Sequence, residues 1–335
     1  MKSFEKRFKE ITPLGFGLNY KSRWDLWSSV REFVQNAFDI TTEMMSPAAR
    51  SSSFGMSAQG ELASAVSLDY DAESKIGYIE DKGPGIKFRH IFLSESKGKN
   101  SFDINCLRGQ FGEGMKFAII PILRDGHQVL IRTVGSDYHF SSVTLDDKGD
   151  DAFDLIHVFR APNKITQGTC VAISGVDPTV YRDKFVPFLK KEQVVLSAPD
   201  KCQTRNVLNY PGQIFIRDVY LAETPAYFGY NFWFKHPTKM TDPDRSSFKA
   251  NKIEEIAKEF GPFYQLLNKP EGRVYWKNLL QKMLADKSEK RRKAQKLEWA
   301  VLEAAHEFFD GDFRVDDYAE SLFTLITEVV GTGKV

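Results

Sequence analysis

The sequence predicts an α+β fold in which helices cover one face of a mixed, largely antiparallel sheet. Three observations favour it. A helix-like segment precedes a hairpin pattern, only one more helical pattern follows the hairpin, and four strand-like segments then follow one another without a helix between them. A parallel sheet would instead alternate strands with helices. Because 335 residues exceed one usual domain, we expect a two-layer sandwich in residues 1–180, a smaller α/β domain in 181–270 and a helical region in 271–335.

The first elements follow from the spacing of apolar residues. Six apolar side chains at near-helical spacing predict a helix over residues 22–45. Val66, Leu68 and Tyr70 alternate with polar residues and predict a strand, and a second strand begins at Ile76 after a short turn. Residues 86–108 are polar and aperiodic, which is typical of a mobile lid.

The later elements are assigned in the same way. Apolar residues after a glycine cluster predict a helix over 112–123, and alternation predicts strands over 129–134, 138–145, 153–159 and 169–174. Asp177 before Pro178 indicates a helix start, and we expect that helix to reach about residue 191. The rest of the chain is predicted as strands over 213–221 and 227–235 and helices over 251–267, 271–309 and 315–330.

Composition excludes several classes of protein. A hydrophobic content of 42% and a charged content of 27% are typical of globular proteins, and the net charge of +1 does not favour nucleic acid or membrane. The three cysteines and six histidines show no disulfide or metal-binding spacing, so we expect no zinc site. There is no signal-peptide pattern and no run of about 18 apolar residues, so we expect a cytoplasmic protein without a membrane span.

Two segments place polar groups where a nucleotide can be bound. Glu32, Asn36 and Asp39 share one face of the first predicted helix, because positions i, i+4 and i+7 align. An exposed helix face is the alternative interpretation. Asp81-x-Gly83-x-Gly85 follows a strand, where glycines let a ligand approach the backbone and a carboxylate can accept a hydrogen bond from a base amine. An ordinary tight turn would explain that segment as well.

Two further segments complete the pattern. Gly109, Gly112 and Gly114 precede a predicted helix whose free N–H groups, together with Lys116, form an anion site. A glycine hinge is the alternative interpretation. Thr169 opens an apolar strand and indicates little by itself.

The order and spacing of these segments resemble the GHKL, or Bergerat-fold, ATPase superfamily, which includes gyrase-type topoisomerases, the ninety-kilodalton heat-shock chaperone, sensor histidine kinases and the MutL proteins. Residues 32–39 resemble its E-x-x-x-N-x-x-D box, residues 81–85 its D-x-G-x-G box and residues 109–114 its G-x-x-G-x-G box. The last box and the lid segment 94–97 are closest to the chaperone branch. The resemblance covers about residues 20–180, and the chain is similar to stand-alone phage and bacterial members.

The resemblance implies a role for each residue. Glu32 is implied to be the general base for the attacking water, and Asn36 a ligand of Mg²⁺. Asp39 is implied to line the pocket, and Asp81 to bind the adenine amine with help from Thr169 through water. The other residues implied to contact ATP are Gly83, Gly85, Ile86, Lys97, Gly109, Gln110, Phe111, Gly112, Glu113, Gly114, Met115 and Lys116.

The resemblance therefore implies a Mg²⁺-dependent, slow ATPase whose nucleotide state orders a lid and switches a homodimer or a protein-partner interface. The alternatives are a non-catalytic ATP sensor, an ATPase subunit of a DNA-linked assembly and a histidine kinase. Glu32 argues against a pure sensor, and no phosphoacceptor histidine precedes the first box.

Beyond residue 180 the sequence offers candidate cations. Arg245 or Lys235 would contact the terminal phosphate, as a lysine of a second domain does in gyrase-like relatives, although ordinary surface charge is the alternative. Six basic residues between Lys287 and Lys296 would suit nucleic acid, but a solvated helix face is the favoured interpretation.

Overall fold

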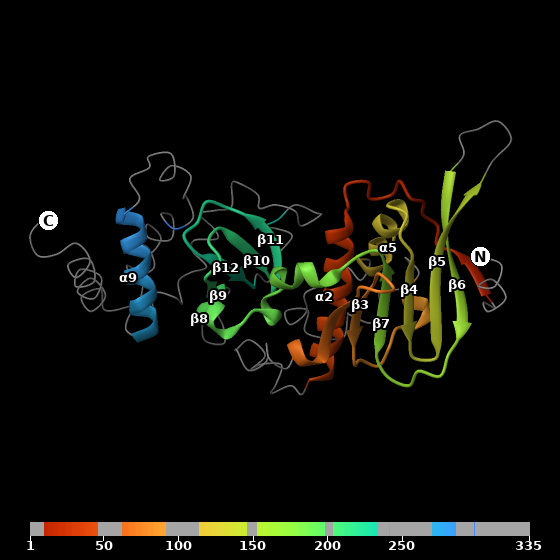
Figure 1. Ribbon diagram of the computed structural model, residues 1–335, viewed down its shortest axis with the longest axis horizontal. Coiled ribbons are helices and arrows are strands. Elements are labelled where there is room, and N and C mark those ends of the chain that lie inside the picture. The colour runs from red at the N-terminus through yellow and green to blue at the C-terminus, as the bar shows by residue number, and fades with distance from the viewer. Residues whose placement is uncertain are drawn as a thin grey trace, which may run out of the picture. The chain divides into compact units, whose positions relative to one another are not determined.

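A computed structural model describes residues 10–45, 62–91, 114–145, 153–197, 204–233, 241, 270–285 and 298 (Figure 1). The chain divides into two compact units, of which the first reaches Asp183 and the second begins at Lys184. The first unit confirms the α+β class, because it combines helices with a large antiparallel sheet.

The first unit contains seven strands in the order β1-β6-β5-β4-β7-β3-β2. Their bounds are β1 (Glu10–Pro13), β2 (Val66–Asp71), β3 (Ile76–Asp81), β4 (Val129–Thr133), β5 (Ser136–Leu145), β6 (Phe153–Pro162) and β7 (Thr169–Ser174). Every neighbouring pair is antiparallel, so the expected mixed pairing does not occur among these strands. The predicted hairpin over 66–81 is confirmed, whereas β1 was not predicted.

Two helices cover one face of this sheet. Helix α2 (Leu26–Met44) packs on β2 and β3, α5 (Gly114–Arg124) packs on β4 and β5, and the helices pack against each other. Helix α2 begins four residues later than predicted, because the Asp25 side chain accepts a hydrogen bond from the Ser28 N–H at 2.8 Å and caps the helix there.

The core lies between the helices and the sheet. Ile79 of β3, Val171 of β7 and Ile131 of β4 lie opposite one another in register and are at most 5% exposed. We call these three residues the apolar row. Because strand side chains alternate between faces, residues two positions away along each strand lie on this same helix-covered face.

The second unit contains a five-stranded sheet in the order β11-β10-β12-β9-β8 and a helix, α9 (Pro270–Ala285). The strand bounds are β8 (Val194–Ser197), β9 (Thr204–Leu208), β10 (Gln213–Ile216), β11 (Val219–Glu223) and β12 (Gly229–Phe232). Strands β10 and β12 are parallel. The predicted helices over 251–267 and 315–330 lie outside the described residues, as does the predicted helix 271–309 after Ala285 except for Glu298.

Two predictions about this part of the chain are wrong. The helix expected after Asp177 is replaced by short 3-10 segments, Pro178–Lys184, Val186–Phe188 and Lys191–Gln193. Pro187 lacks an N–H group, and Phe188 and Leu189 donate to residues three positions back. The single strand expected over 213–221 is a hairpin that turns at Arg217 and Asp218, which have φ values of 50° and 68°.

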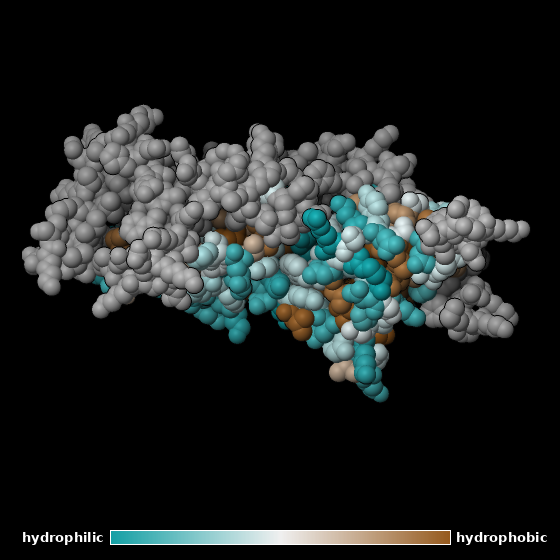
Figure 2. Space-filling model, turned by 90° about the horizontal axis from the view of Figure 1, so that it is seen from above, coloured by the Kyte–Doolittle hydropathy of each residue, from teal (hydrophilic) through white to brown (hydrophobic). Residues whose placement is uncertain are grey.

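In the view of Figure 2 the coloured surface is mostly hydrophilic, with small apolar patches. The exposed large apolar residues, which include Ile11, Val180 and Val274, are spread over separate elements. Among the described residues, no helix is both long enough and apolar enough to cross a membrane.

A buried amide network holds the second sheet together. The Asn231 side chain, 0% exposed, donates to Asn206 at 2.9 Å and to the Asp218 carboxylate at 2.8 Å, and accepts from the Asp218 N–H at 3.0 Å. Asn231→Leu leaves these partners without their hydrogen bonds in the core. We therefore expect it to lower the free energy of unfolding by about 3 kcal/mol in urea denaturation.

The matched control is Asn209→Ala, because Asn209 is exposed. Its expected effect is below about 0.5 kcal/mol. Equal losses of stability for the two variants would contradict a stabilising role for the network.

Candidate functional site

The helix-covered face of the first sheet carries a row of polar residues next to the apolar row. Asp81 of β3 lies opposite Thr169 of β7, which lies opposite Thr133 of β4. Each is two residues along its strand from the apolar row and therefore lies on the same face. Thr133 and Thr169 are 0% and 6% exposed. We call these three residues the polar row.

Asp81 is the acidic residue of the polar row, and hydrogen-bond donors of the protein itself lie close to its carboxylate. Its carboxylate accepts from the Gly83 N–H at 2.7 Å and lies opposite Thr169, whose backbone N–H and hydroxyl also act to lower its pKa. Burial outweighs these hydrogen bonds and raises the pKa of Asp81 to about 6. A carboxylate has about four acceptor positions, so these groups leave it a position for a ligand such as an exocyclic amine.

The glycines after Asp81 are required by close packing. A Cβ at Gly83 would lie 2.6 Å from Ile40 of α2 and 2.8 Å from the Asp81 carboxylate. Gly85 has φ +87°, and a Cβ there would lie 2.8 Å from the hydroxyl of Thr133. The turn therefore folds back onto α2 and the polar row, so that its backbone lines the space beside Asp81.

A second cluster forms where α2 meets the start of α5. A Cβ at Gly114 would lie 1.8 Å from Oε2 of Glu32, so only glycine leaves room for this carboxylate. Nη2 and Nε of Arg31 donate to Oε1 of Glu32 at 3.0 and 3.3 Å. The side chains of Arg31 and Glu32 are 6% and 13% exposed. One carboxylate oxygen is thus held by arginine, while the other lies against the N-terminus of a helix.

The other polar residues that the sequence singled out on α2 and α5 differ in exposure and in the atoms that a ligand could contact. Asn36 donates from Nδ2 to the Glu32 carbonyl at 2.7 Å, which leaves its amide oxygen as the atom that suits a hard cation. Asp39 is 2% exposed. Lys116 of α5 is 1% exposed and Met115 is half-buried. Within the described residues, no three acids, histidines or cysteines gather as a metal site.

Part of the predicted lid is fixed to the sheet. The Ile86 N–H donates to the Thr133 hydroxyl at 2.7 Å, and the short helix η1 (Phe88–Ile91) follows. The Phe88 ring stacks on Tyr138 with centroids 5.7 Å apart, and Ile91 is 1% exposed. The prediction that a mobile connection begins at residue 86 is therefore wrong, because the chain is packed as far as Ile91.

The structure thus brings together Glu32, Asn36 and Gly114 in one cluster, and Asp81, Gly83, Gly85, Ile86 and Thr169 in another. Sequence reasoning missed Thr133 and Arg31. The signal for Thr133 was its place two residues after Ile131 in an alternating strand. Outside the described residues lie Lys97, Gly109, Gln110, Phe111, Gly112, Glu113, Lys235, Arg245 and the basic segment 287–296.

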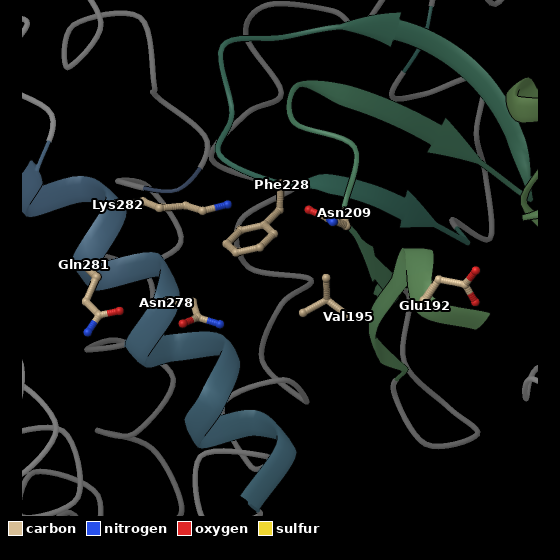
Figure 3. Close-up of a pocket in the computed structure, with 7 residues that line it drawn as sticks. All are labelled: Glu192, Val195, Asn209, Phe228, Asn278, Gln281 and Lys282. Carbon is tan, nitrogen blue, oxygen red and sulfur yellow. The ribbon is translucent and has the colours of Figure 1, made fainter. Parts of the chain in front are cut away.

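The second unit has a pocket of about 310 Å³ beside α9 (Figure 3). The Lys282 ammonium lies 4.0 Å from the centroid of the Phe228 ring and donates to the Tyr227 carbonyl at 3.4 Å. The pocket is lined by Glu192, Val195, Asn209, Phe228, Asn278, Gln281 and Lys282. None of these belongs to the candidate nucleotide site, which we place in the first unit on the chemistry of its residues.

A scan against protein-family models found no matching family, and a search of curated proteins found no match either.

Proposed function

We propose that the first unit is a Mg²⁺-dependent ATP-binding domain of the Bergerat type, a two-layer sandwich that hydrolyses ATP slowly. The observation that carries the proposal is the remaining acceptor position of the buried Asp81 carboxylate, in register with Thr169 and enclosed by a glycine turn. Residues far apart in the sequence meet in each cluster, Asp81 with Thr169 and Glu32 with Gly114, which supports a common ligand.

Asp81 accounts for the choice of base. Its carboxylate accepts a hydrogen bond from the exocyclic amine of adenine. Guanine carries a carbonyl at the corresponding position, and that oxygen would face the carboxylate oxygen without a proton between them. ATP is therefore expected to bind in preference to GTP.

In this proposal the phosphates of ATP bind at the cluster of Glu32, Asn36 and Gly114. Helix α5 begins at Gly114, and the free N–H groups of its first turn attract an anion. The amide oxygen of Asn36 would ligate Mg²⁺, which neutralises phosphate charge when bound. Residues 109–113 and Lys97 would complete this end of the site.

Glu32 is the base in the proposed reaction. Arg31 holds Oε1, so that Oε2 is the oxygen free to orient a water molecule. As the water oxygen attacks the terminal phosphorus, its proton passes to Oε2 and the bond to the leaving ADP oxygen breaks. In this proposal the nucleotide state switches a homodimer or partner interface, in which the second unit acts as a transducer.

Equilibrium binding of fluorescent ATP in the presence of Mg²⁺, with unlabelled ATP and GTP as competitors, tests this function. We expect ATP to displace the probe at least tenfold more tightly than GTP, and chelation of Mg²⁺ to weaken binding. Equal competition by GTP, or no binding of the probe, would contradict it.

Gly114→Ala tests the contact between the two helices. The new Cβ displaces the Glu32 carboxylate, so we expect ATP turnover to fall about tenfold or more. Folding should be retained, because the end of a glutamate side chain can rotate away and alanine favours a helix. Phosphate release and the melting temperature are the measurements.

The control is the same substitution in a Glu32→Ala background, where the clashing carboxylate is gone. There Gly114→Ala should change turnover less than twofold. A tenfold loss in both backgrounds would show that Gly114 acts by another route.

A further inference from the structure

Thr133 connects three parts of the candidate site, although none of the sequence motifs contains it. It is 0% exposed and closes β4 at the end of the polar row. Its hydroxyl oxygen lies 2.7 Å from the Ile86 nitrogen and 3.2 Å from the Thr169 hydroxyl oxygen. A Cβ at Gly85 would lie 2.8 Å from this oxygen, so the turn packs onto Thr133 without spare room.

Counting hydrogens gives this cluster one arrangement that satisfies every group. The Ile86 N–H donates to the Thr133 oxygen. The Thr133 hydroxyl has one hydrogen, for which the Thr169 oxygen at 3.2 Å is a nearer acceptor than the Gly168 carbonyl at 3.5 Å. When Thr133 donates to Thr169, the hydrogen of the Thr169 hydroxyl remains for the Asp81 carboxylate, which lies opposite Thr169 in register and whose pKa that hydroxyl lowers. In this arrangement the chain runs one way, from Ile86 through both threonines to Asp81.

We propose that Thr133 is a positioning residue, which orients the Thr169 hydroxyl toward the adenine-binding carboxylate of Asp81 and ties that carboxylate to the fixed root of the lid at Ile86. This inference rests on the proposed function for its ligand, but the geometry of Asp81 can be measured without nucleotide. Successive hydrogen bonds polarise one another, so the donor that Thr133 supplies strengthens the bond from Thr169 to Asp81. The anchored Ile86 N–H holds the turn that encloses the base.

The first measurement is the titration of Asp81 in the free protein, followed by carbon NMR of the aspartate carboxyl groups and assigned with Asp81→Asn. Thr133→Val removes the hydroxyl at nearly constant shape, whereas Thr133→Ser keeps it. We expect the pKa of Asp81 to rise by at least half a unit in Thr133→Val and to stay at the wild-type value in Thr133→Ser, because only valine weakens the bonds to the charged form.

The second measurement is a double-mutant comparison. If Thr133 acts through Thr169, Thr133→Val should not shift the pKa of Asp81 further in a Thr169→Val background. Equal shifts in both backgrounds would overturn the proposed route. An unchanged pKa in a folded Thr133→Val protein would overturn the positioning role itself. Should the valine variant fail to fold, Thr133→Cys is titrated in its place under the same criterion.

The third measurement is ATP affinity. We expect Thr133→Val to bind ATP about tenfold more weakly and Thr133→Ser to stay within twofold of wild type. A shifted pKa with unchanged ATP affinity would overturn the positioning role toward adenine. If no variant, nor the wild type, binds ATP while the pKa shifts as expected, the proposed function fails but the link from Thr133 to Asp81 stands.

Discussion

Replacing Glu32 by alanine is expected to give a protein that binds ATP but no longer turns it over. Oε2 of Glu32 lies against the start of α5, where the phosphates belong in the proposed complex. A positioned base contributes roughly a hundredfold to ten-thousandfold to such a reaction, so turnover should fall by at least about a hundredfold. Phosphate release gives the rate, and calorimetry gives the dissociation constant, which should change less than tenfold because the base has no contact with adenine.

Two variants make this result specific. Glu32→Gln keeps the size of the side chain and an oxygen for Arg31, but it cannot take a proton, so it should lose turnover as completely as alanine does. Glu73→Ala, in the exposed turn between β2 and β3, should leave turnover unchanged. Hydrolysis at the wild-type rate by Glu32→Ala would remove Glu32 from the mechanism.

Replacing Asp81 by asparagine is expected to abolish ATP binding under conditions where the wild type is saturated. The amide presents a donor or a weaker acceptor where the carboxylate accepts from Gly83, Thr169 and the base. An unmatched buried donor costs about 1 to 3 kcal/mol, which corresponds to up to a hundredfold in affinity. Calorimetric titration measures the loss, and a wild-type dissociation constant for Asp81→Asn would contradict the proposed base contact.

The pKa of Asp81 gives this prediction a pH dependence. Protonation of the carboxyl group removes its remaining acceptor position, so ATP affinity should fall as the pH drops through about 6. The same raised pKa has the opposite consequence for the free protein. The folded state binds the Asp81 proton more tightly than the unfolded state does, so this group lowers stability as the pH rises from about 4 to 6.

Asp81→Asn has no titrating group here and should therefore lack the fall in the free energy of unfolding, on the order of 2 kcal/mol, that Asp81 contributes between pH 4 and pH 7.5. Urea denaturation of the wild type and the variant at the two pH values measures this. A variant that loses ATP, unfolds cooperatively and lacks this pH dependence has lost a binding group, whereas a variant without a cooperative unfolding transition has lost its fold.

The parts of the fold that the sequence predicted are those with strong local signals. The hairpin of β2 and β3 alternates apolar and polar residues around a polar turn, and β7 alternates in the same way. Strands β1, β8 and β9 have four or five residues each and do not alternate regularly between apolar and polar residues. The turn at Arg217 and Asp218 has positive φ values without glycine or asparagine, so its sequence carries no hairpin signal.

The candidate site shows the same division between local and tertiary information. Glycines beside Asp81 mark a tight turn in the sequence, so Asp81, Gly83 and Gly85 were found directly. The contact between Thr133 and Thr169 depends on strand register between residues 36 positions apart, which no local pattern encodes. The meeting of Glu32 with Gly114 likewise depends on how α2 packs on α5, although each residue was singled out in its own motif.

Hydrogen exchange with mass spectrometry, with and without ATP and Mg²⁺, tests most directly whether nucleotide binds between the polar row and the start of α5. We expect slower exchange in peptides that span residues 80–86, 114–120 and 167–171, with ATP but not with GTP at the same concentration. Protection confined to residues after Lys184, or none at saturating ATP, would contradict it.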